Sequence, residues 1–133
     1  MQQINLAAAI VGGVVGYFPG ALWYSKALFL KPWAREMGID LDNPPAEKHH
    51  GAKIAIGVVA SVAAAIVFAL IAGPAPTLHH ALLLAIACAG GLVATSFAIQ
   101  YIYEARSPIF WAINAGYHLV QFLIFAIVLA LWP

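Results

Sequence analysis

The chain has 133 residues, of which 64% are hydrophobic and only 8% are charged. Soluble domains carry roughly a quarter charged residues, so six Lys/Arg and five Asp/Glu are too few to build a water-soluble surface. This composition excludes a soluble enzyme, a nucleic-acid-binding protein and a disordered tail, and it indicates an integral membrane protein.

Four apolar stretches are long enough to cross a hydrocarbon layer of ~30 Å, which takes about 20 helical residues. They run from about Ile4 to Tyr24, Ile54 to Ala72, Leu78 to Tyr103 and Ile109 to Trp132. Continuous apolar runs are typical of membrane helices, whereas the strands of a membrane barrel alternate. The sequence therefore predicts an all-α membrane protein in which residues 1–133 form a single four-transmembrane-helix bundle.

The first stretch contains Pro19, which lacks a backbone N–H and should kink the helix. A long loop, Ser25 to Lys53, separates the first stretch from the second. Within this loop, the segment from Lys31 to Gly38 predicts a short helix at the membrane interface. On it we expect apolar side chains to face lipid and basic side chains to reach head groups. The apolar set is Leu28, Phe29 and Trp33, and the basic set is Lys26, Lys31 and Arg35.

The two later connections are short and carry helix-start signals. In the connection from Gly73 to Thr77, Thr77 is placed to cap the third helix. Ser107 followed by Pro108 predicts an N-cap with proline at the first helical position of the fourth helix.

Basic residues are distributed unevenly among the loops. They lie in or beside the first loop (Lys26, Lys31, Arg35, Lys48 and Lys53) and in the third (Arg106). The positive-inside rule then places loops one and three in the cytoplasm and both termini outside, an N-out/C-out topology. We expect the protein to lie in the bacterial cytoplasmic (inner) membrane.

Each predicted helix carries small residues at four-residue spacing. Such stripes let helix backbones approach closely in lipid, so we expect a seam within the bundle, with a homodimer interface as the alternative. The stripes are Gly12, Gly16 and Gly20; Gly57, Ser61, Ala65, Ala69 and Gly73; Ala87, Gly91 and Thr95; and Ala112 with Gly116.

Polar residues gather in the half of the bundle that we expect to face the cytoplasm. Asn114, His118 and Gln121 share one face of the fourth helix, at i, i+4 and i+7. At ~1.5 Å per residue, His118 lies about 15 Å deep, and Ser61, Thr95 and Gly16 lie at about 12 to 13 Å. Nearer the cytoplasm follow Gln100, Tyr101, Tyr103, Glu104, Arg106, Tyr24 and Ser25, whereas the outer half offers only Cys88.

A transmembrane channel needs polar lining on both sides of the membrane, which this pattern does not supply. The pattern favours a cytoplasm-facing intramembrane pocket for a lipid-, quinone- or isoprenoid-like amphiphile. The candidate ligand-binding residues are Tyr24, Tyr103, Glu104, Arg106, Asn114, His118 and Gln121.

Each candidate also has a structural interpretation. Asn114 and Gln121 are of the type that links membrane helices by hydrogen bonds, and Glu104 with Arg106 are of the type that forms interfacial ion pairs. In the functional interpretation, Arg106 binds an anionic head group and Glu104 orients Arg106 or His118.

The histidine doublets do not predict a metal centre. His49–His50 and His79–His80 fall on opposite sides of the membrane, and His118 stands alone between them. A bis-histidine haem would lack its second ligand, so we expect neither a metal site nor a cofactor.

Three segments together resemble a known family. They are Gly20-Ala-Leu-Trp-Tyr-Ser25 with Leu28-Phe29 and Lys31-x-Trp33, then Tyr103-Glu-x-Arg106, and Ile113-Asn-x-Gly-Tyr-His118. The chain resembles the small membrane proteins catalogued as domain of unknown function 1761 over nearly its whole length. Lys26 and Leu30 depart from the family pattern, which often has proline and glycine there. The resemblance implies four transmembrane helices and no defined activity.

Two further functions remain open beside amphiphile binding. One is an accessory or scaffold subunit that packs against a second copy or another membrane protein through its small-residue stripes. The other is a membrane enzyme with His118 as general base, Arg106 holding an anion, and Tyr24 or Tyr103 donating to a developing oxyanion.

Overall fold

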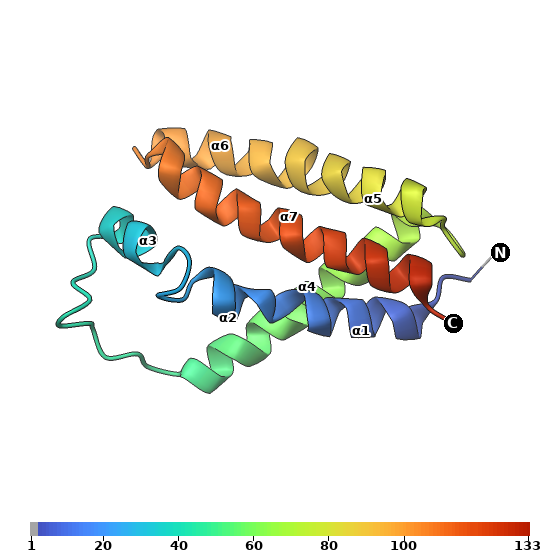
Figure 1. The fold of residues 1–133 in the computed structure, drawn as a ribbon, viewed down its shortest axis with the longest axis horizontal. Helices are drawn as coiled ribbons and strands as arrows, with labels where there is room; N and C mark the ends of the chain where they lie inside the picture. Colours follow the sequence, from blue (N-terminus) through green and yellow to red (C-terminus); the bar gives the residue numbers. More distant parts are fainter. Residues whose placement is uncertain (1–2) are drawn as a thin grey trace.

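The structure, a computed structural model, describes residues 3–133, and within that range every regular element is a helix (Figure 1). The elements in chain order are α1 (Leu6–Tyr17), α2 (Pro19–Trp23), α3 (Leu30–Met37), α4 (His50–Ala72), α5 (Leu78–Ile86), the π-helical η1 (Ala87–Val93), α6 (Ala94–Tyr103) and α7 (Pro108–Leu131). Four helical segments, of 18, 23, 26 and 24 residues, are long and apolar enough to cross a membrane.

The predicted caps are confirmed. Thr77 accepts a hydrogen bond from the backbone N–H of His80, and Ser107 accepts one from Phe110. Each hydroxyl satisfies an N–H group that has no partner inside its own helix. Asn5, which the sequence analysis did not single out, caps α1 in the same way through Ala8.

The first segment is interrupted at its proline, as predicted, and the second segment starts earlier than predicted. α1 ends at Tyr17 and α2 starts at Pro19, so the first segment is interrupted where proline removes a backbone donor, as predicted. α4 starts at His50, four residues before the apolar run. The helix extends past its apolar part because its first turn is exposed, where polar side chains cost little.

The third segment contains a π-helical stretch that periodicity does not reveal. In η1 the hydrogen-bonding pattern widens, and the N–H of Ala94 binds the carbonyl oxygen of Ala89, five residues earlier. Gly90 and Gly91 lie within this stretch, and an added Cβ on either would meet no atom within 4 Å.

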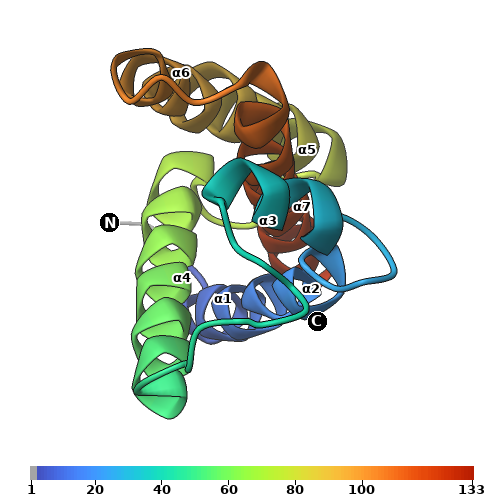
Figure 2. The same ribbon diagram turned by 90° about the vertical axis from the view of Figure 1, so that its left-hand side faces the viewer.

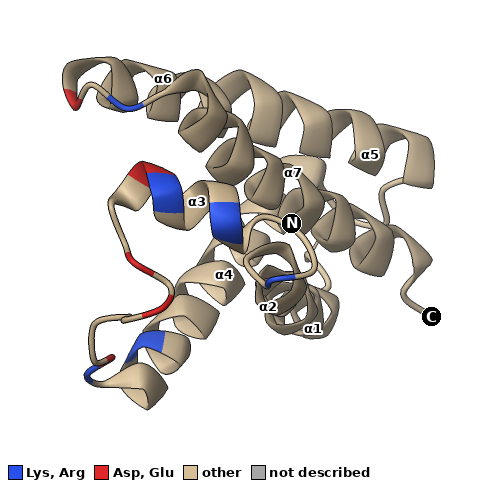
Figure 3. Cartoon of the chain, turned by 60° about the vertical axis from the view of Figure 1, so that its left-hand side comes forward, with Lys and Arg blue, Asp and Glu red and all other residues tan. Residues whose placement is uncertain are grey.

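The molecule has two distinct ends. All eleven charged side chains lie in residues 26–53 and 104–106, which form one end of the bundle, here called the charged end (Figure 3). Residues 3–5, the connection 73–77 and the last residues of α7 line one cavity at the other, uncharged end. Residues 3–5 and the end of α7 therefore lie on the same side of the molecule, as Figure 1 shows.

Small residues form the seam between α1 and its neighbours, as predicted for the first two stripes. A Cβ on Gly12 would lie 3.6 Å from Val128 of α7, and one on Gly13, a residue outside the predicted stripe, would lie 2.5 Å from the Cα of Val62 in α4. In α4 the matching stripe residues Ser61, Ala65 and Ala69 are all buried. Close backbone approach through small residues thus holds α1 between α4 and α7.

The third stripe differs from its prediction. Gly91 has open space where a Cβ would be, and Thr95 is exposed and donates its hydroxyl hydrogen to Gly91 of its own helix. Among residues 3–133 this stripe packs against no neighbouring helix, because α5, η1 and α6 turn another face toward α7.

The short helix predicted in the first loop is α3, and Gly38 ends it in the left-handed conformation, with φ of 69°. Its aromatic side chains do not all face outward as expected. The Phe29 ring lies 4.7 Å from Trp23, and the Trp33 ring lies 5.9 Å from Tyr24, whereas Leu28 is exposed. The reason is a tight reversal before α3, in which the N–H of Phe29 binds the carbonyl oxygen of Trp23 and folds α3 back onto α7.

Candidate functional site

A first polar cluster lies where α2, α6 and α7 meet near the charged end. The Tyr24 hydroxyl donates to Oδ1 of Asn114 at 2.8 Å, and Nδ2 of Asn114 donates to the Tyr101 hydroxyl oxygen at 3.1 Å. Asn114 thereby joins the first, third and fourth membrane-length segments. On the third segment, the residue that contacts Asn114 is Tyr101 and not the predicted Tyr103.

Tyr24 lies directly after the first membrane-length segment, and its side chain is half-buried. Burial raises the pKa of Tyr24 well above its ordinary value, and the neighbouring Tyr117 and Tyr101 hydroxyls raise the pKa further. A phenol that stays protonated is a hydrogen-bond donor, which matches its contact with the acceptor oxygen of Asn114.

A second polar cluster lies deeper and joins α1, α4 and α7. The Ser61 hydroxyl donates to the carbonyl oxygen of Gly13 at 2.7 Å, and Nε2 of Gln121 donates to Ser61 Oγ at 2.9 Å. Nδ1 of His118 lies 2.7 Å from Oε1 of Gln121. Ser61 and Gln121 are buried, and His118 is half-buried.

Thr95 was expected at the depth of this cluster, and the structure does not bring it there. Its side chain is exposed and bonds only to carbonyl groups one turn back in its own chain. A depth count along each helix gives no information on which way a side chain points around the helix, which is why the prediction could not exclude this arrangement.

Three aromatic side chains use backbone carbonyl groups as acceptors and fix the helices around the polar clusters. Trp23 donates to Ile113, Trp111 donates to Ala94, and Tyr117 donates to Tyr17, at 2.7 to 2.8 Å. None of these three roles was predicted from the sequence. Two of the rings pack against glycines that lie in the predicted small-residue stripes, and these glycines were the only sequence feature that pointed to large neighbouring side chains. A Cβ on Gly116 would lie 2.8 Å from the Trp23 ring, and one on Gly20 would lie 3.0 Å from the Tyr117 ring.

A groove runs along α4, here called the α4 groove. Figure 2, viewed from the charged end, shows α4 beside α1 and apart from α6. Three adjacent cavities of about 400, 360 and 360 Å³ follow the groove. The first two share Tyr17 and Tyr117, and the second and third share Ala64, Val93 and Phe122.

The α4 groove is apolar except at a few positions. The first cavity is lined by Tyr24 and His50 at the charged end, the second by His118, Gln121 and Ser61, and the third ends beside Cys88. Among the residues that line these three cavities there is no Lys, Arg, Asp or Glu. The groove thus combines apolar walls with neutral polar groups near its middle.

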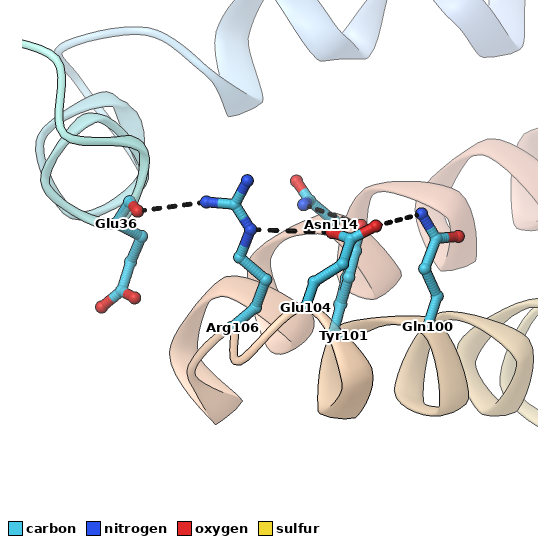
Figure 4. Close-up of polar contacts among 6 residues, drawn as sticks. All are labelled: Glu36, Gln100, Tyr101, Glu104, Arg106 and Asn114. Atoms are coloured by element: carbon cyan, nitrogen blue, oxygen red, sulfur yellow. Dashed lines mark hydrogen bonds and ion pairs between the residues drawn. The ribbon is translucent and has the colours of Figure 1, made fainter.

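Tyr103, Glu104 and Arg106 lie apart from the α4 groove. Tyr103 is 88% exposed. Gln100 donates to Glu104 at 2.8 Å, and Arg106 Nε lies 3.7 Å from the Glu104 carboxylate (Figure 4). Between them Ala105 adopts φ of 55°, and neither charged residue lines the second cavity beside His118.

Arg106 is held by α3 and by an aromatic ring. One guanidinium nitrogen lies 3.5 Å from the carbonyl oxygen of Glu36, and the guanidinium carbon lies 5.0 Å from the centre of the Phe110 ring. Arg106 therefore connects the α6–α7 turn to α3 (Figure 4), and the expected contact of Glu104 with His118 is not formed.

The histidine doublets lie at opposite ends of the molecule. His50 contacts Glu47 at 2.9 Å in the first loop, and this hydrogen bond lowers the pKa of the exposed Glu47 carboxyl. Within residues 3–133, no group of three or more His, Cys, Asp or Glu side chains is arranged to hold a metal ion.

One comparison with known proteins gave a match. The model of the family described as "Protein of unknown function (DUF1761)" matches residues 7–130. No curated protein and no solved structure matches the chain. The matched residues include both polar clusters and the whole lining of the α4 groove.

Proposed function

The chain belongs to the DUF1761 family of unknown function, and from this premise we propose that it binds or carries a small amphiphile in the α4 groove. The observation that carries the proposal is the groove itself, with apolar walls along most of its length and His118, Gln121 and Ser61 in its middle. Ligand pockets typically pair apolar walls with a few well-placed polar groups.

The charge distribution supports an orientation for this groove. All six Lys and Arg side chains lie at the charged end, and the positive-inside rule assigns that end to the cytoplasm and both termini to the outside. In this orientation the protein lies in the bacterial cytoplasmic membrane, and α3 lies at the interface. The cavity beside Tyr24 and His50 then opens toward the cytoplasmic leaflet.

The packing of the opposite half supports a bundle interior that is filled on the outer side, between the helices and away from the α4 groove. Phe68 and Phe125 are almost fully buried, and they pack with Ala69, Ala85 and Ala126 into the main apolar core. An amphiphile would therefore enter the groove sideways from lipid or from the charged end. A route across the whole membrane is not part of the proposal.

Native mass spectrometry of the protein extracted in mild detergent tests the proposal. Ala60 lines the second cavity and is exposed, so Ala60→Trp fills the groove with little strain on the packed helices. Val59 is 69% exposed and lines none of the three cavities, so Val59→Trp adds the same ring on the same helix outside the groove.

The wild type and Val59→Trp should retain a small lipid-soluble molecule, and Ala60→Trp should lose it. An empty wild-type protein, or equal retention in both variants, would contradict binding in the α4 groove.

A second candidate function is assembly with another membrane helix. Gly90, Gly91 and Thr95 form an exposed face of small residues that has no partner among residues 3–133. Small residues exposed on a membrane helix favour close packing with a second copy or a partner subunit. This face lies on η1 and α6, so assembly there leaves amphiphile binding possible.

A further inference from the structure

We propose that the amphiphile in the α4 groove carries a neutral hydroxyl group, which donates a hydrogen bond to Nε2 of His118. This inference rests on the proposed function and names the chemical class of its ligand. It follows from the direction of the hydrogen bonds in the deeper polar cluster, and one backbone carbonyl group fixes that direction.

The direction is set first at Gly13. A carbonyl oxygen only accepts hydrogen bonds, so the Ser61 hydroxyl, 2.7 Å away, must donate its single hydrogen to Gly13. Ser61 Oγ has no second hydrogen and can only accept from Gln121. The atom of Gln121 that faces Ser61 is therefore the amide nitrogen, and its oxygen faces His118.

The direction then passes to the imidazole ring. Oε1 of Gln121 is an acceptor and lies 2.7 Å from Nδ1 of His118, so Nδ1 must carry a hydrogen. A neutral imidazole carries only one N–H, which leaves Nε2 with a free lone pair. The chain of bonds from Gly13 thus leaves an acceptor atom at Nε2 of His118, whose side chain lines the second cavity.

The accessibility of Nε2 follows from the remaining contacts of His118. The ring lies against Phe97 and Tyr117, with centroid distances of 5.3 and 5.1 Å, and its only hydrogen bond to the described residues is the one from Nδ1 to Gln121. Across the described residues, no side-chain nitrogen or oxygen is both buried and without a hydrogen-bond partner. Nε2 has no hydrogen-bond partner among the described residues, so it is not fully buried, and the His118 side chain lines the second cavity.

The charge of the ligand follows from the lining of the groove. No acidic side chain lines the three cavities to stabilise an imidazolium, and no Lys or Arg lines them to stabilise a phosphate or carboxylate. An unpaired charge is costly in such surroundings. Arg106, the basic residue nearest to His118 in the sequence, contacts α3 and Glu104 instead. A neutral hydroxyl is a donor group that the site accepts without a counter-ion.

Three probes that share one apolar chain test this inference. They are the isoprenoid alcohol farnesol, its methyl ether, which cannot donate a hydrogen bond, and farnesyl phosphate, which is charged. Binding is measured on protein in lipid nanodiscs with ¹⁵N-labelled histidine. The same spectra report the protonation of each ring nitrogen of His118. The signals of His118 are identified as those that disappear in His118→Phe.

We expect Nδ1 of His118 to be protonated and Nε2 to be unprotonated before any probe is added. Farnesol should shift the Nε2 signal and bind about five- to tenfold more tightly than the ether, the effect of one hydrogen bond in an apolar site. The phosphate should bind no more tightly than the ether.

Two variants separate hydrogen bonding from packing. His118→Phe should bind alcohol and ether equally. His118→Gln, which keeps an acceptor at the position of Nε2, should restore part of the preference for the alcohol. A protonated Nε2 in the free protein, or a preference for the alcohol that survives His118→Phe, would overturn the inference.

The outcomes distinguish the absence of a hydroxyl-selective His118 from the absence of amphiphile binding in the α4 groove. If alcohol and ether bind equally to the wild type and Ala60→Trp blocks both, the groove binds amphiphiles but His118 does not select a hydroxyl. If the phosphate binds most tightly, the ligand is anionic and the inference is wrong. If no probe binds, the hydroxyl assignment is overturned, and mass spectrometry of the extracted protein still decides whether the groove holds another amphiphile.

Discussion

Individual glycines decide how closely the helices approach, and their surroundings differ sharply. A Cβ on Gly13 would lie 2.5 Å from Val62 Cα and 2.9 Å from its backbone nitrogen, which cannot move without moving α4. A Cβ on Gly51, in the exposed first turn of α4, would meet no atom within 4 Å.

We therefore expect Gly13→Ala to destabilise the protein by about 1 to 3 kcal/mol, the usual cost of overpacking a close contact. Gly51→Ala should leave stability within about 0.5 kcal/mol of the wild type. Thermal unfolding in detergent, followed by circular dichroism, measures both. Equal melting temperatures for the two variants would show that α1 and α4 do not approach as closely as described.

The hydroxyl groups of two tyrosines near the charged end should also differ in their contributions. Tyr24→Phe removes the donor to Asn114 and should destabilise the fold by about 1 kcal/mol, the net value of a typical hydrogen bond. Tyr103→Phe is the matched control, because Tyr103 is 88% exposed and its change should have almost no effect. Unfolding by denaturant measures both, and a larger loss for Tyr103→Phe would contradict the placement of the two rings.

At the scale of the elements, the sequence predicts the helices better than the faces that they turn inward. Apolar run length and the hydroxyls of Thr77 and Ser107 are local signals, and they locate three of the four segment starts within about two residues. Tyr101 and Tyr103 are two residues apart on α6, so they point about 200° away from each other. Only the packing of α6 against α7 decides that Tyr101 faces Asn114.

The two parts of the predicted site differ for the same reason. Asn114, His118 and Gln121 share a face of one helix, which periodicity reveals, and each makes contacts within a polar cluster. Glu104 and Arg106 lie in a turn, where a positive φ at Ala105 redirects the chain and helical spacing gives no information. The α4 groove depends on the angle between α4 and α6, which is set by contacts between residues far apart in the sequence.

The exposed small-residue face of η1 gives a prediction for this element. If it packs against a second copy, Gly91→Cys in a Cys88→Ala background should form a disulfide-linked dimer on mild oxidation in membranes. Leu70→Cys in the same background is the control, because Leu70 is 61% exposed on α4 and lies outside this face. Equal cross-linking at both positions would indicate random collision and would exclude a dimer through η1.

At the scale of the whole molecule, the charge asymmetry and the position of the ends define a topology that can be measured. The first loop and the α6–α7 turn lie at the charged end, and the connection 73–77 lies at the other end with residues 3–5 and the end of α7. With all six Lys and Arg side chains at one end, the positive-inside rule predicts that this end faces the cytoplasm.

Single cysteines in a Cys88→Ala background separate the two sides. Asp42→Cys in the first loop should be protected from a membrane-impermeant maleimide in intact cells and should react after the membrane is opened. Ala75→Cys should react with the reagent in intact cells. Reversed labelling would place the charged end outside, and the groove mouth beside Tyr24 and His50 would then open toward the outer leaflet. Labelling of both positions in intact cells would indicate two orientations, which the strong charge bias disfavours because each Lys or Arg in a short loop adds to the same preference.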